Sequence, residues 1–368
     1  MKKGFYIHIP FCSSKCNYCS FYSTTDLNLK GEFLKALQRE IEIKRKIFSN
    51  FFTDNRKTTL YIGGGNPAIL DNTELESLFF ILKGLSSDFS EVTIELNPDN
   101  VTKEKLKLLK SFGVNRVSLG IQSFCDNVLE FLGRRHNLRA SLTALENTAK
   151  LFDNYSIDMI GGIPSVERDW KNEFSFVKAF LPPHISFYLL SVEEGTRFFG
   201  RLKLDDDLQS NEYHNFCNFL AEHDYEHYEV SNFCRDGYYA EHNLLYWDGE
   251  DYLGFGPSAS SFLKEASIRL KNTSSVRHYI NHPEDFEVER LTQEDRFLET
   301  VFLSLRTSKG MNLEIIKSEY PSFFEKLETH IDLLKKEGYL IESGKNVTIP
   351  KQHRLVMNEI VLNLIKES

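Results

Sequence analysis

The chain has 368 residues, of which 41% are hydrophobic and 26% are charged, as in ordinary soluble globular proteins. This length suits two or three domains and a substantial core without disulfides. The formal net charge of -9 excludes a broad attraction to nucleic acid or to anionic lipid.

The amino-terminal stretch MKKGFYIHIPFC does not have the pattern of a signal peptide, because His8 and Pro10 interrupt its apolar run. The apolar run LFFIL at 78–82 is far shorter than a membrane span, so we expect no transmembrane segment. Peripheral membrane contact stays open, although no basic amphipathic helix argues for it. Sparse cysteines and the lack of a targeting signal predict a cytoplasmic protein.

From residue 4 to about residue 191, short β-rich runs alternate with amphipathic helical patterns. The helical patterns include 31–48 and 73–85, and the β-rich runs begin at residues 4, 58, 92, 116, 155 and 184. A spacing near 30 residues is typical of βαβ units. We therefore expect an α/β fold in which residues 1–200 form a partial (β/α) barrel of about six parallel strands.

Three of the six cysteines, Cys12, Cys16 and Cys19, follow the first expected strand with the spacing C-x3-C-x2-C. Outside oxidising compartments, such a group is typical of metal binding. Three thiolates on a [4Fe-4S] cluster leave one iron open, whereas a structural zinc site takes four ligands. Three unligated thiols, or a zinc site completed by a distant histidine, stay as alternatives.

Other candidate residues stand at the ends of successive expected strands. Gly63, Glu95, Gln122 and Asp158 occupy positions equivalent to that of Cys12. In a parallel βα barrel, the carboxyl ends of the strands share one face, and active sites lie there. Each polar residue alone could satisfy a buried neighbour, but together they predict one site.

After residue 200 the βα rhythm loosens. We expect an α/β extension over 201–288 and a C-terminal helical domain over 289–368, which resembles a winged helix. Basic and acidic residues are interspersed there, so a structural cap is favoured over nucleic-acid binding. A zinc site is not expected in the extension, since its histidines and cysteines match no compact spacing: His214, Cys217, His223, His227 and Cys234.

The stretch YIHIPFCSSKCNYCSFYS at 6–23, with Tyr18 before the last cysteine, resembles the radical S-adenosylmethionine (SAM) superfamily. The resemblance implies a [4Fe-4S] cluster on Cys12, Cys16 and Cys19, with SAM on the open iron. YIGGGNP is similar to the GGGTP stretch of the family, with Asn66 in place of Thr. The residues implied to contact the bound cofactors are Tyr6, Gly63, Gly64, Gly65, Asn66, Glu95, Gln122, Arg134 and Asp158.

Two features indicate a branch within the oxygen-independent coproporphyrinogen oxidase group. The oxidases carry a further cysteine two residues after the third, and Phe21 occupies that position here. HNLLYW at 242–247 resembles the HNxxYW motif of HemW-type haem chaperones. This motif implies haem contacts for His242, Asn243, Tyr246 and Trp247, because imidazole ligates haem iron and aromatic rings pack on porphyrins. The identity of the axial ligand stays open.

The resemblance thus implies a haem chaperone that binds haem and passes it to an acceptor protein. Nucleic acid is not an expected partner. One alternative is an enzyme, a radical SAM decarboxylase that converts coproporphyrinogen III to protoporphyrinogen IX. Another is a barrel that has lost its cluster and keeps a structural or binding role.

Overall fold

The computed structural model describes residues 2–86 and 88–366. Its main feature is a twelve-stranded sheet with the order β12-β11-β10-β9-β1-β2-β3-β4-β5-β6-β8-β7. The six expected strands run parallel in chain order: β1 (Lys2–Ile9), β2 (Lys57–Gly64), β3 (Glu91–Leu96), β4 (Arg116–Gln122), β5 (Tyr155–Gly161) and β6 (His184–Leu189). The predicted α/β fold class is confirmed.

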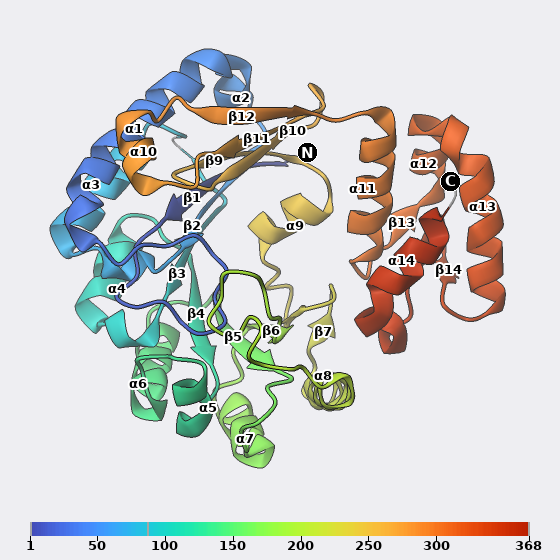
Figure 1. Ribbon diagram of the computed structural model, residues 1–368, viewed down its shortest axis with the longest axis horizontal. Helices are drawn as coiled ribbons and strands as arrows, with labels where there is room; N and C mark the ends of the chain where they lie inside the picture. Colours follow the sequence, from blue (N-terminus) through green and yellow to red (C-terminus); the bar gives the residue numbers. More distant parts are fainter. Residues whose placement is uncertain (1, 87, 367–368) are drawn as a thin grey trace.

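Helices connect these strands and cover the outer face of the curved sheet (Figure 1). They are α1 (Lys30–Ile47), α2 (Ser49–Thr53), α3 (Asn72–Leu82), α4 (Lys103–Ser111), α5 (Asp126–Phe131), α6 (Leu138–Ala149) and α7 (Trp170–Phe180). The start of α3 shows how the local sequence fixes where a helix begins. Asp71 accepts from the Glu74 backbone N–H (2.8 Å), and the Glu74 carboxylate accepts from that of Asp71 (2.9 Å), which completes a capping box.

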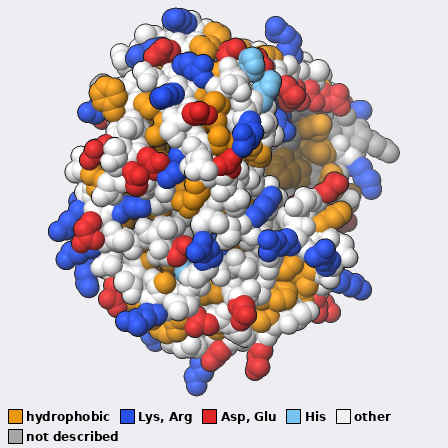
Figure 2. Space-filling view, turned by 60° about the vertical axis from the view of Figure 1, so that its left-hand side comes forward, with side chains coloured by type: hydrophobic (Ala, Val, Ile, Leu, Met, Phe, Trp, Pro, Cys, Tyr) orange, Lys and Arg blue, Asp and Glu red, His pale blue; other side chains and the backbone are white. Residues whose placement is uncertain are grey.

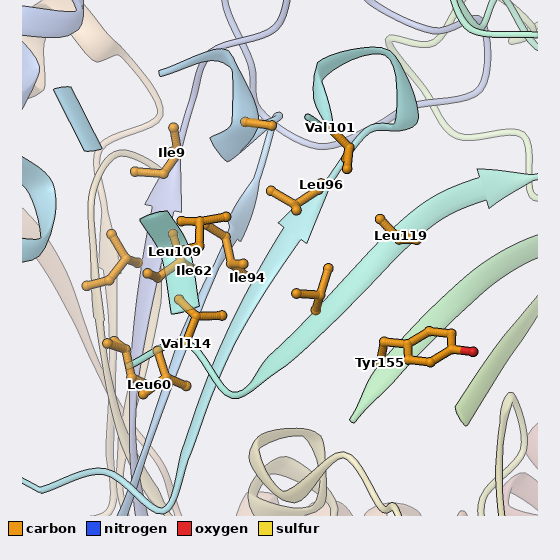
Figure 3. Close-up of a cluster of buried hydrophobic side chains, with 14 of the residues drawn as sticks. Ile9, Leu60, Ile62, Ile94, Leu96, Val101, Leu109, Val114, Leu119 and Tyr155 are labelled. Carbon is orange, nitrogen blue, oxygen red and sulfur yellow. The ribbon is translucent and has the colours of Figure 1, made fainter. Parts of the chain in front are cut away.

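The core lies between the sheet and these helices. Figure 3 shows Ile62 and Ile94 beside Leu109 of α4, and all three side chains are fully buried. In β4, Val117, Leu119 and Ile121 are fully buried in this core, and the residues between them face the other side of the sheet. This packing fixes the carboxyl ends of the strands, from which the candidate site residues project.

The central segment extends both edges of the same sheet. β9 (Asp251–Phe255) pairs parallel with β1, so the structure has a seventh parallel strand where the sequence suggested about six. A short strand in a glycine-containing segment has little periodicity from which to predict it. The other elements of the segment are α8 (Asp206–Ala221), β7 (Glu226–His227), β8 (Asn232–Cys234), α9 (Glu241–Trp247), β10 (Ser260–Leu263), β11 (Ile268–Asn272), α10 (Val276–Asn281) and β12 (Phe286–Arg290).

The C-terminal part has its own core, which includes Phe297, Leu327 and Val361, and it packs beside α9 (Figure 1). Its elements are α11 (Gln293–Leu305), β13 (Met311–Asn312), α12 (Leu313–Glu319), α13 (Pro321–Lys336), β14 (Ile341–Ser343), β15 (Asn346–Thr348) and α14 (Met357–Ile365). The exact boundaries at 200 and 288 stay predictions. Within the described residues, none of the helices has both the length and the hydrophobicity needed to cross a membrane.

Candidate functional site

The three cysteines lie in a loop that begins where β1 ends. Backbone hydrogen bonds from Cys12 N to Thr24 O (3.0 Å) and from Thr24 N to Pro10 O (2.7 Å) close its base. The Asn17 side chain donates to Phe131 O (2.8 Å), which fixes the loop on α5. All three thiols are free and line one cavity of about 350 Å³.

The same cavity brings together most of the residues predicted from the sequence. Its wall includes Cys12, Cys16, Cys19, Gly64, Gly65, Asn66, Glu95, Gln122, Arg134, Asp158 and Asn243. These residues come from the ends of β1 to β5, from the segment after α5, and from α9. Gly63 is in direct contact with Glu95, and Tyr6 lines a second cavity instead.

Glu95 is the central acid of this cavity. Tyr61 donates to its Oε1 (2.7 Å) and the Gly64 backbone N–H to its Oε2 (3.1 Å). Burial, followed by the nearby charge of Asp158, raises the pKa of Glu95 to about 7. A Cβ atom on Gly63 would lie 2.8 Å from the Glu95 carboxyl carbon, so any larger residue there would displace this carboxyl from its hydrogen bonds.

Two neighbouring strand ends supply further polar groups. Gln122 has a φ of 66°, and the pairing of β4 with β5 shifts register just before it. A left-handed, non-glycine residue at a bulge is strained, and such strain concentrates at functional sites. Ser118 donates to Asp158 (3.1 Å), and burial raises the pKa of Asp158.

Arg134 extends along the wall toward the cysteine loop. Its Nη2 donates to Asn97 Oδ1 and Gly120 O, both at 2.8 Å, and its Nη1 lies 3.7 Å from Cys16 Sγ. Its Nε is buried and has no hydrogen-bond partner in the described part of the chain. Asn66, in contrast, uses its side chain for local structure, since it accepts from the Ala68 backbone N–H (3.2 Å).

The cysteines suit a multi-iron cluster. Burial raises the pKa of the Cys12 thiol to about 11, so a thiolate there requires a positive ligand such as iron. A four-iron cluster takes one thiolate on each of three irons, so its ligands do not have to meet at one point. Among the described residues, no three His, Cys, Asp or Glu side chains are grouped around a site for a single ion.

A larger cavity of about 1130 Å³ adjoins the first, and the two share Lys15, Ser20 and Phe21 in their walls. Phe21 is 65% exposed. The other aromatic side chains of the larger cavity are Tyr6, His8, Tyr22, Tyr246, Trp247, Tyr252, Phe262 and Phe302. A hollow floored by hydrophobic side chains is visible on the face shown in Figure 2.

The four residues of the HNLLYW motif that were predicted to contact haem lie in different places. Asn243 lines the smaller cavity, whereas Tyr246 and Trp247 line the larger one. His242 is fully buried and lines neither. Its Nδ1 bonds with Thr59 Oγ1 (2.8 Å) and its Nε2 with Tyr246 Oη (2.9 Å), and burial lowers its pKa to about 3.

Sequence reasoning missed several wall residues. Asn97 lies two positions after Glu95 at the same strand end. Its closeness to Glu95 in the sequence could have identified it as a wall residue. Tyr252 and Phe262 face each other across β9 and β10, but this pairing is long-range and the local sequence carries no sign of it. Phe302 and Leu298 come from α11 of the C-terminal part, which the sequence presented only as a cap.

The radical SAM superfamily model matches residues 6–177. This match and the cysteine loop within it define the class of protein as radical SAM, a class that implies a [4Fe-4S] cluster and SAM. The chain is 33% identical to the haem chaperone HemW of Bacillus subtilis (strain 168), covering 97% of this chain and 98% of that one. It is 35% identical to HemW of Lactococcus lactis subsp. lactis (strain IL1403), covering 88% and 86%. The chain belongs to the HemW family, which confirms the resemblance stated from its motifs.

A solved structure, the coproporphyrinogen III oxidase HemN from Escherichia coli, superposes with a TM-score of 0.81 at 20% identity. The similarity covers 100% of this chain and 90% of that one. At this level of identity the match establishes a shared fold alone. The assignment to the HemW family, and not to the HemN oxidases, therefore rests on the HemW sequences and on the motifs.

Proposed function

We propose that this protein is a haem chaperone, which binds haem in the larger cavity and passes it to an acceptor protein. The observation that carries the proposal is the position of Tyr246 and Trp247, the aromatic residues of the HNLLYW motif, in the wall of that cavity. Ligand sites are typically concave, mostly apolar and provided with a few polar groups. A flat aromatic macrocycle matches this chemistry.

The smaller cavity would hold the resident cofactors. Cys12, Cys16 and Cys19 would ligate a [4Fe-4S] cluster, which when bound supplies single electrons and an open iron for SAM. Gly64 and Gly65 line the cavity with backbone atoms alone. Glu95 and Asp158 would accept hydrogen bonds from SAM, and the unpartnered Nε of Arg134 is a donor available for its carboxylate.

Anaerobic reconstitution with iron and sulfide tests the cluster ligands. The wild-type chain should take up about four irons and gain the broad absorption of a [4Fe-4S] cluster. Cys16→Ala should lose this signal, whereas Cys125→Ala, a thiol outside both cavities, should keep it. An unchanged spectrum in Cys16→Ala would remove the cysteine loop from the proposal.

His242 holds Tyr246 through its Nε2. We propose that this imidazole orients Tyr246 in the wall of the larger cavity. Iron ligation by His242, which the motif implies, would require this hydrogen bond to break. In a haem titration of His242→Ala, an altered Soret band would indicate ligation, whereas an unaltered band with weaker affinity would indicate positioning alone.

The decarboxylase stays as the alternative, because HemN shares the fold. Parallel assays on the reconstituted protein separate the two functions. We expect stoichiometric haem binding, and no protoporphyrinogen IX from coproporphyrinogen III with SAM and a reductant. Turnover of coproporphyrinogen III, with weak or no haem binding, would overturn the chaperone proposal.

A further inference from the structure

The larger cavity has two chemically different ends, and the strand register distinguishes them. Tyr252 of β9 faces Phe262 of β10, and these rings lie with Trp247 and Phe302 at one end. Toward the carboxyl end of β9, Ser260 faces Lys271 of β11. Side chains directly opposite on antiparallel strands share one face, so Arg269 lies opposite Phe262 at the aromatic end, where glutamates neutralise it. The basic and hydroxylic groups without such a partner follow at the Ser260–Lys271 pair.

The basic end lies beside the cysteine loop. The Tyr22 hydroxyl of that loop accepts from the Val276 backbone N–H (2.6 Å), just after the end of β11. Ser258 and Ser274 are hydrogen-bonded to each other (3.0 Å) at the same end. Both serines line the cavity with Lys271 and with Lys15 of the cysteine loop.

The charges of the cavity wall are not all available to a ligand. Arg269 is paired with Glu289 (3.2 Å) and with Glu299. Lys15 and Lys271 lack an ion-pair partner within the described ranges, as do the wall carboxylates Glu194 and Glu250. Glu250 follows Trp247 and Gly249 toward the aromatic end. Glu194 lies four residues before Phe198, whose backbone N–H donates to Asn17 O of the cysteine loop (3.2 Å). The end beside that loop therefore holds two unpaired cations and one unpaired carboxylate.

Haem has an apolar macrocycle and two propionate carboxylates on one edge. Resting on the haem-binding function proposed above, we infer that Lys271 and Lys15 bind the haem propionates. The propionate edge then faces the cysteine loop, and the opposite edge lies among Trp247, Phe262 and Phe302. Lysine ammonium groups bind carboxylates through charge-assisted hydrogen bonds, and this orientation buries the apolar edge against aromatic rings.

The test compares haem with haem dimethyl ester, which keeps the iron and the macrocycle but has no carboxylates. Equilibrium titrations use the reconstituted wild type and Lys271→Glu, with Lys107→Glu on the exposed surface of α4 as the charge-matched control. Lys271→Glu should weaken haem binding roughly tenfold and leave binding of the ester within about twofold. Lys15→Gln should act in the same direction while its iron content stays that of the wild type.

Equal effects of Lys271→Glu and Lys107→Glu on haem would overturn this inference while leaving haem binding intact. The same conclusion would follow if the ester lost as much affinity in Lys271→Glu as haem does. Binding of neither ligand to the wild type would instead overturn the proposed function itself. The two failures are therefore distinguishable.

Discussion

Glu95 shows how one residue can couple ligand binding to stability. Its carboxyl group is buried beside Asp158 and held by Tyr61 and Gly64. Burial makes this carboxyl group costly to ionise, and a ligand that supplied hydrogen-bond donors or positive charge would offset that cost. A buried acid with a raised pKa in a cavity is a frequent mark of function, here independent of any family resemblance.

The first prediction concerns the pH dependence of the cluster-free protein. The pKa of Glu95 is raised from 4.5 to about 7, so the folded state binds this proton more tightly than the unfolded chain. Its stabilising contribution is present below pH 4.5 and is lost as the pH rises to about 7. Glu95→Gln should not show this loss, since the amide oxygen can accept from Gly64 while the Tyr61 hydroxyl accepts from the amide nitrogen.

Relative to wild type, Glu95→Gln should therefore gain stability between pH 5 and pH 8, by about 3 kcal/mol at most. Urea unfolding at both pH values measures this gain. Glu76→Gln, at an exposed position of α3, is the control for a general charge effect. A constant difference between Glu95→Gln and wild type across this range would refute the buried, protonated carboxyl.

At the scale of elements, the strand ends and the loop after β1 make the site. The β-rich runs and their spacing predicted this arrangement because parallel strands impose a common edge. The pairing of β9 with β1 and the contribution of α11 were not predictable, since both depend on contacts between residues far apart in the chain. Tyr6, which the resemblance places among the cofactor contacts, lines the larger cavity, and its role stays a prediction.

The second prediction concerns Gly65, where the loop after β2 passes the cysteine loop. A Cβ atom here would lie 2.6 Å from Phe11 O and 3.0 Å from Ile9 O, and backbone atoms cannot move aside as a flexible side chain can. Gly65→Ala should destabilise the fold by about 1–3 kcal/mol and reduce iron uptake by displacing the start of the cysteine loop.

Gly31→Ala is the matched control, because a Cβ atom at this α1 position meets nothing within 4 Å. Alanine is the better helix former, so this variant should be neutral or slightly stabilised. Thermal unfolding and the iron content after reconstitution report both effects. Equal behaviour of the two variants would show that the close approach at Gly65 is unimportant.

At the scale of the whole molecule, the C-terminal part is joined to the sheet next to the HNLLYW motif. Arg306, directly after α11, forms an ion pair with fully buried Glu229 (2.8 Å). Its guanidinium also lies 4.3 Å from the centre of the Trp247 ring. The sequence suggested a structural role for Glu229, but the arginine that it pairs with lies 77 positions away and no local pattern connects the two.

The third prediction follows from this junction. Arg306→Gln removes the direct ion-pair partner of buried Glu229 and should cost about 3–5 kcal/mol of stability. In a Trp170→Phe background, the fluorescence of the remaining Trp247 should shift to longer wavelength as its contact is lost. Lys309→Gln, which breaks only the exposed ion pair with Asp248 (3.1 Å), should cost less than about 1 kcal/mol. Similar costs for both variants would contradict the account of the junction.

Haem titration of the anaerobically reconstituted chain, followed by Soret absorption, tests the central claim most directly. The account predicts saturation at one haem per chain. It also predicts affinity at least roughly tenfold weaker in Trp247→Ala, which removes an aromatic wall of the cavity, but unchanged in Trp170→Phe on α7. No saturable binding by the wild type, or equal affinity in Trp247→Ala and wild type, would contradict it.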